Sequence, residues 1–423
     1  MSSCPRRECS TWRLCRFAGR SAGPDGELKP GYHSGVSAGR AQTGDWRWRG
    51  ESDRAIDRVK AAFHGAAIIA GIASRRFALT GPWFVTFKLT RACNLTCAFC
   101  RYRGGAGDEG GSMPASRGAV HLDRDLALRT LEELPELGTQ RVSFQGDGEP
   151  LLYPHLFEVL GEARRLGLVC ELITNGVMIT DDVASRLVEL EIDKVCVSIT
   201  SATQESYTAL HGGNGGRHWP GVREGVRRLV RRRGGASRPK VLLVYVLARP
   251  NWREVPEMIA QADELGADGV AFAPMAVYSD EMRALAVTAE EERAALEALR
   301  TGIAGLGGDR AIEIVGDPLL RYGGGEGIAS RIRCSIGWLT AGVRPAGEVV
   351  PCLRSDWIAG NLHDQSFREI WRGPAFQEFR RRSIRIGGGT DPALKSRCSY
   401  CCFYPMLRRA NHAVSLASFF TWA

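Results

Sequence analysis

The sequence predicts an α/β fold in which six strand–helix units form a partial parallel barrel over residues 81–310, followed by a small α+β domain over residues 311–423. After Pro82, short runs rich in β-branched and aromatic residues alternate with segments of helical period, which is typical of a parallel sheet. Beyond Ala311 the alternation stops, and a strand–turn–strand pattern precedes a cysteine-rich end. Apolar residues make up 44% of the chain, enough to bury a large core.

Six runs are the expected barrel strands: Trp83–Leu89, Arg141–Phe144, Val169–Thr174, Lys194–Ile199, Lys240–Val246 and Gly269–Ala273. In such a barrel the reactive groups are expected at the C-terminal ends of the strands. One N-terminal helix is expected within residues 51–80, because Ile56, Val59 and Phe63 recur at helical spacing. Residues 1–50 are rich in Gly, Ser and Arg without an apolar period, and we expect a disordered leader there.

The formal net charge of +9 is a mild basic excess. Its densest run, residues 227–233, ends a predicted helix, where cations complement the helix dipole. We therefore expect no nucleic-acid and no membrane partner. The first thirty residues carry no secretory signal, which predicts a cytoplasmic protein. Thiols stay reduced in that compartment, so the 13 cysteines indicate metal binding or catalysis rather than disulfides.

Three cysteines follow directly after the first expected strand. Cys93, Cys97 and Cys100 are spaced C-x3-C-x2-C in the segment KLTRACNLTCAFC. Three thiolates from one short loop can hold three irons of a [4Fe-4S] cube and leave the fourth iron open to a ligand. A zinc site or a ferredoxin would use C-x2-C pairs, and neither fits the first interval.

With Phe99 before the third cysteine, this segment resembles the signature of the radical S-adenosylmethionine (SAM) superfamily. The resemblance implies a partial (β/α)6 barrel with a SAM-binding [4Fe-4S] cluster on Cys93, Cys97 and Cys100. It implies that the open iron chelates the amino and carboxylate groups of SAM. An electron from an external donor of the flavodoxin or ferredoxin type then cleaves SAM to a 5′-deoxyadenosyl radical, which abstracts a substrate hydrogen.

The resemblance continues at the ends of the next strands. The segment from Gly146 to Glu149 resembles the superfamily's GGE segment, which contacts the SAM amino group, and departs from it at Asp147. Polar residues after the third and fourth strands would meet the SAM ribose, with Ser198 preferred, although each alone also suits a helix cap. Arg249 could bind a carboxylate bidentately or lie on the surface. The expected SAM-binding residues are Phe99, Gly146, Asp147, Gly148, Glu149, Asn175, Ser198, Thr200 and Arg249.

A second cysteine group lies in the C-terminal domain. Cys334 and Cys352 flank the expected hairpin, and Cys398 and Cys401 form C-x2-C. Four thiolates fill all four iron positions of a [4Fe-4S] cluster, and a structural zinc ion on the same cysteines is the alternative. The spacing resembles the twitch form of the SPASM-type extension, which implies an auxiliary [4Fe-4S] cluster on these four residues. Cys402 is expected to be a buried or neighbouring thiol.

The auxiliary spacing also resembles the radical SAM aminocyclitol dehydrogenases of the butirosin type. This resemblance implies oxidation of an alcohol in a carbohydrate-like or aminocyclitol intermediate, hence a small-molecule substrate. The alternatives are redox-neutral epimerisation or rearrangement of a small molecule, radical modification of a peptide or protein, and an iron–sulfur or zinc protein without catalysis. Epimerisation would use Cys170 or Cys196 as hydrogen-atom donor, although both lie in apolar strand runs and suit packed side chains.

Overall fold

The computed structural model describes residues 43–44, 55–102, 120–212, 215–277, 279–304, 313–315, 330–394, 401, 403, 406–407 and 410–413. Most of the expected leader, together with Cys398 and Cys402, lies outside these residues. Among the described helices, none combines the length and the apolar character needed to cross a bilayer. The cytoplasmic location stays a prediction.

Six neighbouring strands form the parallel barrel sheet that the sequence predicts. They are β2 (Phe84–Lys88), β3 (Arg141–Gln145), β4 (Val169–Thr174), β5 (Lys194–Val197), β6 (Lys240–Leu247) and β7 (Gly269–Pro274). They pair in chain order, and every pair is parallel. The expected bounds agree to within two residues, and the α/β fold class is confirmed.

The sheet extends beyond the expected barrel at both edges. On one side, β8 (Glu313–Val315) pairs with β7, and β1 (Thr43–Gly44) pairs with β8. On the other side, β9 (Thr340–Val343) lies parallel to β2 and is followed by the antiparallel β10 (Glu348–Val350) and β11 (Gly360–Asn361). The predicted hairpin therefore continues the barrel sheet and covers the edge of β2, which would otherwise be unpaired.

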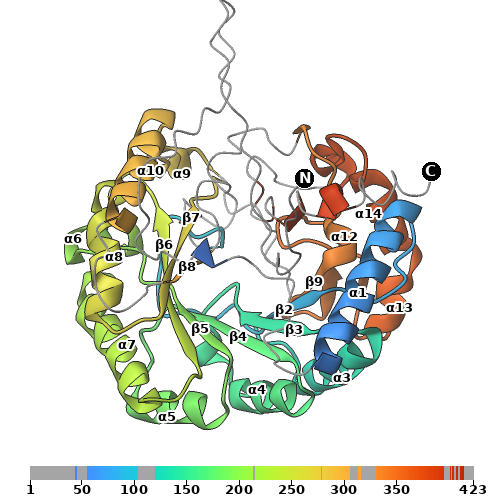
Figure 1. Ribbon diagram of the computed structural model, residues 1–423, viewed down its shortest axis with the longest axis horizontal. Coiled ribbons are helices and arrows are strands. Elements are labelled where there is room, and N and C mark those ends of the chain that lie inside the picture. Colours follow the sequence, from blue (N-terminus) through green and yellow to red (C-terminus); the bar gives the residue numbers. More distant parts are fainter. Residues whose placement is uncertain are drawn as a thin grey trace, which may run out of the picture. The chain divides into compact units, whose positions relative to one another are not determined.

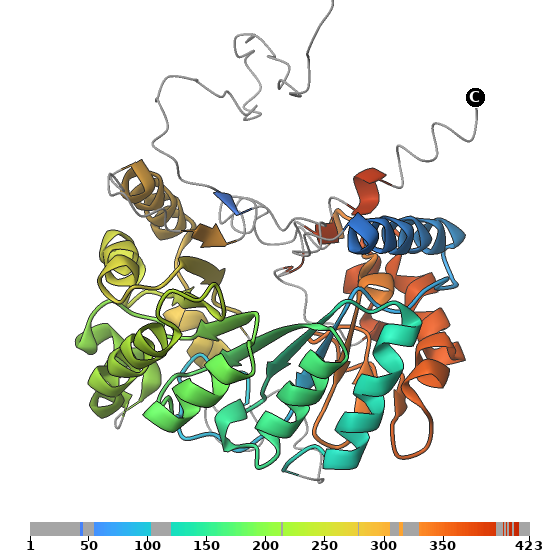
Figure 2. The same ribbon diagram turned by 60° about the horizontal axis from the view of Figure 1, so that its bottom comes forward.

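Helices cover the outer side of the parallel strands, as Figure 1 shows for α3, α4, α5, α7 and α8. Figure 2, turned by 60°, shows α3, α4, α5 and α7 in front of the strands. The α-helices described up to residue 304 are α1 (Ala55–Ser74), α3 (Arg124–Leu137), α4 (Leu156–Arg165), α5 (Asp181–Glu189), α6 (Gln204–His211), α7 (Trp219–Arg233), α8 (Val255–Glu264), α9 (Asp280–Leu285) and α10 (Ala289–Ala304). Side chains of Asp123, Thr180 and Thr203 cap α3, α5 and α6 by accepting backbone N–H groups.

Helix α12 (Ile336–Leu339) directly precedes β9, and α13 (Phe367–Arg372) and α14 (Pro374–Ser383) follow β11. A capping box formed by Ser366 and Glu369 starts α13. The N–H of Phe367 and the N–H of Arg368 both donate to the carboxylate of Glu133 on α3. These contacts join the C-terminal segment to the helices of the barrel.

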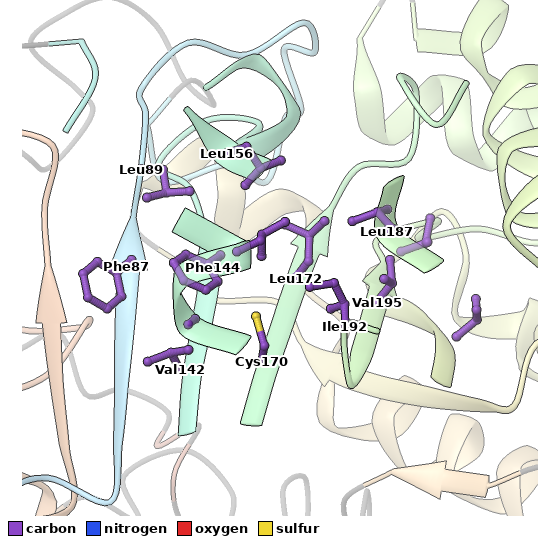
Figure 3. Packing of buried hydrophobic residues seen from close by; sticks show 14 of the residues in the cluster. Phe87, Leu89, Val142, Phe144, Leu156, Cys170, Leu172, Leu187, Ile192 and Val195 are labelled. Carbon is purple, nitrogen blue, oxygen red and sulfur yellow. The ribbon is translucent and has the colours of Figure 1, made fainter. Parts of the chain in front are cut away.

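The main core lies between the parallel strands and these outer helices. Alternate strand residues point toward the helices and are fully buried, including Val142, Phe144, Cys170, Leu172 and Val195. Figure 3 shows the sulfur of Cys170 enclosed by these apolar side chains. Because side chains alternate along a strand, the residues between them face the inner side of the sheet.

Helix α1 packs against the C-terminal segment through Ile68 and Ile72, which share a core cluster with Trp338. One turn before Ile68, the buried His64 places its Nδ1 3.0 Å from Oγ1 of Thr80. Burial lowers the pKa of His64 from 6.5 to about 4. The imidazole therefore stays neutral in the folded protein over a range where it is protonated in the unfolded chain.

Because of His64, we expect the stability of the fold to fall as the pH is lowered. The unfolded chain gains a proton at His64 as the pH falls below 6.5, whereas the folded protein does so only near pH 4. The free energy of unfolding is therefore unaffected by the protonation of His64 well above pH 6.5 and falls on acidification. The loss due to His64 is about 2 kcal/mol between pH 7.5 and pH 5. Urea unfolding at both pH values should show this loss in the parent and a smaller loss in His64→Gln. Equal pH dependence in both proteins would contradict the prediction.

Candidate active site

The first cysteine group lies on the loop that leaves β2. Cys93, Cys97 and Cys100 are all half-buried, and the N–H of Cys100 donates to the carbonyl of Cys97 at 3.0 Å. Three accessible thiols on one short loop suit an iron–sulfur cluster, in which each thiolate binds a different iron. Within the described ranges, no three His, Cys, Asp or Glu side chains are arranged to hold a metal ion. The fit of the cluster therefore rests on the chemistry and spacing of these donors.

The turn after β3 is clamped against the start of this loop. The N–H of Gly148 donates to the carbonyl of Thr90 at 2.9 Å, and the N–H of Glu149 donates to the carbonyl of Ala92 at 2.8 Å. A Cβ at Gly148 would lie 2.0 Å from the Ala92 oxygen, and one at Gly146 would lie 2.2 Å from the Gly148 oxygen. Only glycine at these two positions allows the backbones to approach so closely.

Gly148→Ala is therefore expected to separate the turn from the cysteine loop. The clash is with backbone, so no side-chain rotation relieves it, and we expect a cost of about 1–3 kcal/mol. SAM binding to the reconstituted protein should weaken roughly 10-fold. Gly161→Ala on α4 is the control, because its nearest neighbour would be 3.6 Å away. Equilibrium dialysis with labelled SAM measures the affinity of each variant. Equal affinities would contradict the claim that Gly148 holds the turn against the cysteine loop.

Glu149 ties the same turn to the end of β4. Its buried carboxylate accepts hydrogen bonds from the N–H of Leu151 at 3.0 Å, the hydroxyl of Thr174 at 2.6 Å and the N–H of Asn175 at 2.7 Å. Burial raises the pKa of Glu149, while these three hydrogen bonds oppose the shift. Since protein donors occupy the carboxylate, the side chain positions the turn.

Asn175 and Ser198 stand at the neighbouring strand ends, as predicted. The side-chain amide of Asn175 donates to Oδ1 of Asn94, between Cys93 and Cys97, at 2.7 Å. The N–H of Ser198 donates to the carbonyl of Thr174 at 2.8 Å, and its side chain is half-buried. The structure thus brings the ends of β3 and β4 to the cysteine loop and places the end of β5 beside that of β4.

Thr200 is placed differently from the expectation of an accessible hydroxyl. Its side chain is buried, donates to the carbonyl of Ile199 at 2.9 Å and lies 3.3 Å from Nε2 of His211. Its φ of 56° is in the left-handed region, and the amide of Asn251 donates to its carbonyl at 2.6 Å. Phe99 packs edge-on against His211 at 5.6 Å between ring centroids. The Thr200 hydroxyl is therefore bonded within the protein.

Arg249 lies on the surface, which was the alternative to a carboxylate-binding role. Its side chain is 48% exposed and its Nε is 3.5 Å from a carboxylate oxygen of Glu291. A second weak contact reaches the carbonyl of Ala284 at 3.4 Å. The position of Arg249 therefore does not support the bidentate binding of a carboxylate.

A buried group of ion pairs, which sequence reasoning missed, joins the cysteine loop to the C-terminal hairpin. Lys88 forms an ion pair with Asp147 and donates to the hydroxyl of Tyr102 at 2.5 Å. Arg101, next to Cys100, donates to Oδ1 of Asp356 at 2.6 Å and to the carbonyl of Leu353 at 3.0 Å. The Asp147 side chain, which departs from the superfamily pattern, is thus the partner of Lys88, the last residue of β2.

Arg344, on the turn between β9 and β10, completes this group. It donates to the carbonyl of Ser355 at 2.9 Å and lies 3.7 Å from Asp356, the partner of Arg101. Burial lowers the pKa of Lys88. The carboxylate of Asp147 opposes this shift, whereas the positive charges of Arg344 and Arg101 add to it. A lysine at an inward position of a predicted strand is a signal that could have revealed the group, because a buried charge requires a partner.

Cys170 and Cys196 lie on opposite faces of the sheet. Cys170 is fully buried and faces the outer helices, within the core in Figure 3. The thiol of Cys196 faces the inner side and donates to a carboxylate oxygen of Glu171 at 3.4 Å. Burial raises the pKa of both thiols well above the ordinary value. Only Cys196 is placed where a substrate in the barrel could meet it.

The second cysteine group gathers in the cluster that also holds α1 and α12. Cys352 is a buried member, and Cys334 and Cys401 pack against the same cluster as partly buried side chains. The N–H of Cys334 donates to the carbonyl of Ser383 at 3.0 Å, which fixes it to the end of α14. Three of the four expected ligands therefore share one apolar environment, and Cys398 is outside the described residues.

A parallel barrel with a C-x3-C-x2-C loop after its first full strand, and a second cysteine group beside that barrel, define a radical SAM enzyme with an auxiliary cluster domain. Residues 87–262 match the radical SAM superfamily, and residues 334–402 match the SPASM iron–sulfur cluster-binding domain. The PqqA peptide cyclase of Gluconobacter oxydans is 30% identical over 313 residues, covering 71% of this chain and 79% of the relative. That of Xanthomonas campestris pv. campestris strain 8004 is 30% identical over 315 residues, covering 71% and 76%. The chain belongs to the radical SAM–SPASM family that includes the PqqA peptide cyclases.

Solved structures show the same fold. Streptococcus suis SuiB bound to S-adenosylmethionine is 15% identical with a TM-score of 0.57, covering 77% of this chain and 73% of SuiB. Native anSMEcpe with bound AdoMet and Kp18Cys peptide is 17% identical with a TM-score of 0.56, covering 80% of this chain and 98% of anSMEcpe. At these identities the likeness concerns the fold alone.

These comparisons settle the cofactors and correct the expected partner. The radical SAM and SPASM domains confirm SAM and [4Fe-4S] clusters as the cofactors. The expectation of a small-molecule substrate is wrong, because the relatives at 30% identity are cyclases of a peptide, PqqA. The sequence could not reveal this, since substrate selection depends on side chains that follow no general pattern.

Proposed function

We propose that this chain is a radical SAM enzyme that modifies a peptide by abstracting a hydrogen atom from one of its residues. The observation that supports it is the match to the PqqA peptide cyclases, which covers 79% of the Gluconobacter oxydans relative. Peptide modification thereby replaces oxidation of a carbohydrate-like alcohol as the preferred function. The oxidoreductase class stays a prediction.

The proposed cluster ligands are those expected from the sequence. Cys93, Cys97 and Cys100 hold the SAM cluster, and Cys334, Cys352, Cys398 and Cys401 hold the auxiliary cluster. When bound, the SAM cluster supplies the electron that cleaves SAM to methionine and a 5′-deoxyadenosyl radical. We assign the first group to the barrel domain, residues 81–310, and the second to the domain of residues 311–423, with residues 51–80 as the N-terminal helix.

The surrounding side chains have positioning and binding roles in this proposal. The backbone of residues 146–148 offers polar groups beside the cysteine loop, where it would meet the SAM amino group. Ser198, half-buried at the end of β5, is the hydroxyl that we assign to the SAM ribose. Asn175 and Glu149 hold the loop and the turn in place through the hydrogen bonds described above. Thr200 and Arg249 are left out because their side chains are engaged elsewhere.

Cys196 is the remaining candidate for a hydrogen-atom donor. Its thiol faces the inner side of the sheet, where Glu171 accepts its hydrogen bond. Cys170 is left out because its sulfur is enclosed in the main core, between the strands and the outer helices.

The test uses full-length protein reconstituted anaerobically with iron, sulfide and dithionite. The probes are the PqqA peptide of the relatives and synthetic peptides copied from short reading frames beside this chain's gene. We expect at least one peptide to stimulate release of 5′-deoxyadenosine and to change in mass or fragmentation, with the Cys100→Ala variant as the inactive control. Loss of two hydrogen atoms would identify an oxidation, and an unchanged mass with a new linkage a redox-neutral reaction. If every peptide leaves SAM cleavage unstimulated and is itself unchanged, the proposal fails.

A further inference from the structure

A cavity of about 260 Å³ lies outside the proposed active site, where the end of α1 meets the end of α14. Four arginines and two isoleucines line it: Arg75, Arg333, Arg381, Ile384, Arg385 and Ile386. Arg333 and Ile386 are joined by an antiparallel β-bridge, which fixes the two segments that carry most of the lining. The cavity is therefore part of the folded scaffold.

The cavity carries an excess of positive charge. Arg381 is paired with Glu378 at 2.6 Å. The side chains of Arg75, Arg333 and Arg385 are exposed and form no salt bridge within the described part of the chain. Asp391, which interacts electrostatically with Arg385, is paired with Arg382 at 3.2 Å. Three like charges around one hollow repel each other unless an anion joins them. A bound carboxylate would remove this repulsion and could accept two parallel N–H bonds from one guanidinium.

Apolar side chains complete the lining and indicate the class of anion. Ile386 is 70% exposed, among the most exposed large hydrophobic side chains described, and Ile384 is only 9% exposed. None of the six lining residues is aromatic, whereas single-stranded nucleic acids are held largely by stacking on aromatic rings. Arginines beside exposed aliphatic groups suit a peptide that carries acidic and apolar residues side by side.

We propose that this cavity docks an acidic segment of the peptide substrate, separate from the residue that is modified. The inference rests on the proposed function, because it assigns a second contact to the same peptide. Carboxylates of the segment pair with Arg75, Arg333 and Arg385, and an apolar neighbour covers Ile386. Docking at a fixed surface raises the effective concentration of the rest of the peptide at the barrel.

The experiment measures binding by fluorescence anisotropy to a fluorescein-labelled peptide of repeated Glu-Leu-Glu units. The test variant is Arg75→Glu with Arg385→Glu, which leaves Arg333 intact because it adjoins Cys334. The control is Arg129→Glu with Arg293→Glu, which changes the net charge equally at exposed arginines on α3 and α10. We expect the test variant to bind the peptide roughly 10-fold more weakly or worse, and the control to stay within about 2-fold of the parent.

Several outcomes would overturn the inference. They are equal weakening in both variants, no binding by the parent, and tighter binding of a single-stranded DNA oligonucleotide that is lost in the test variant. Release of 5′-deoxyadenosine without peptide is measured in parallel and should be unchanged in the test variant. Failure of docking with intact SAM cleavage overturns this inference alone, whereas failure of every peptide to be modified overturns the proposed function.

Discussion

Replacing Cys97 by alanine is expected to abolish reductive cleavage of SAM. Three thiolates are needed to hold three irons of the cube and leave one open, and the loop offers three cysteines for this purpose. Release of 5′-deoxyadenosine should fall roughly 1,000-fold or to background, since no other group supplies the electron at that position. Iron content should fall from about eight to about four per chain, because the auxiliary group is intact.

Cys170→Ala is the matched control for this variant. Its sulfur lies in the main core among Val142, Leu172 and Val195. The substitution therefore removes a packed side chain and none of the proposed cluster ligands. Iron content and SAM cleavage should stay close to those of the parent. SAM cleavage by Cys97→Ala at the parent rate would contradict the assignment of the cluster to this loop.

Lys88→Met is expected to have the largest effect on stability. The substitution leaves the carboxylate of Asp147 buried without its cation and removes the donor to Tyr102. Breaking a buried ion pair by removing one partner costs about 3–5 kcal/mol. Guanidinium unfolding of the apoprotein under reducing conditions measures this loss, and Asp147→Asn should show a loss of similar size.

The exposed pair of Lys240 and Glu313 provides the comparison. Its charged atoms are 3.7 Å apart and its side chains are 46% and 33% exposed, so Lys240→Met should cost less than about 1 kcal/mol. A double variant that replaces both Lys88 and Asp147 by apolar residues should recover part of the loss, because no buried charge remains. Equally small losses of unfolding free energy in Lys88→Met and Lys240→Met would contradict the claim that the buried pair of Lys88 and Asp147 stabilises the fold.

The barrel could be predicted because each strand carries its own local pattern. Val169–Thr174 and Lys240–Leu247 are β-rich runs between helices with clear periodicity, and parallel pairing follows from the alternation. The strand β9 could not be placed in this way, because its partner β2 lies about 250 residues earlier in the chain. Short strands such as β8 and β11 are too brief for periodicity to indicate them.

Positions in the candidate site were predictable where they depend on strand ends, and less so where they depend on side-chain partners. Asn175 and Ser198 lie at the expected strand ends, and Asn175 contacts the cysteine loop at Asn94. The hydroxyl of Thr200 instead lies beside His211, 11 positions further along the chain, and the guanidinium of Arg249 lies beside Glu291, 42 positions further along. The ion pair of Arg101 with Asp356 likewise spans 255 positions. Such contacts exist only in the folded chain.

The most direct test of the central claim is an electron paramagnetic resonance measurement on a variant with Cys334→Ala and Cys352→Ala, which removes the auxiliary cluster. The reduced protein should retain one [4Fe-4S] signal, and the addition of SAM should change its g-values, because SAM binds the open iron of the cluster on Cys93, Cys97 and Cys100. A reduced cluster whose spectrum is the same with and without saturating SAM would contradict the account.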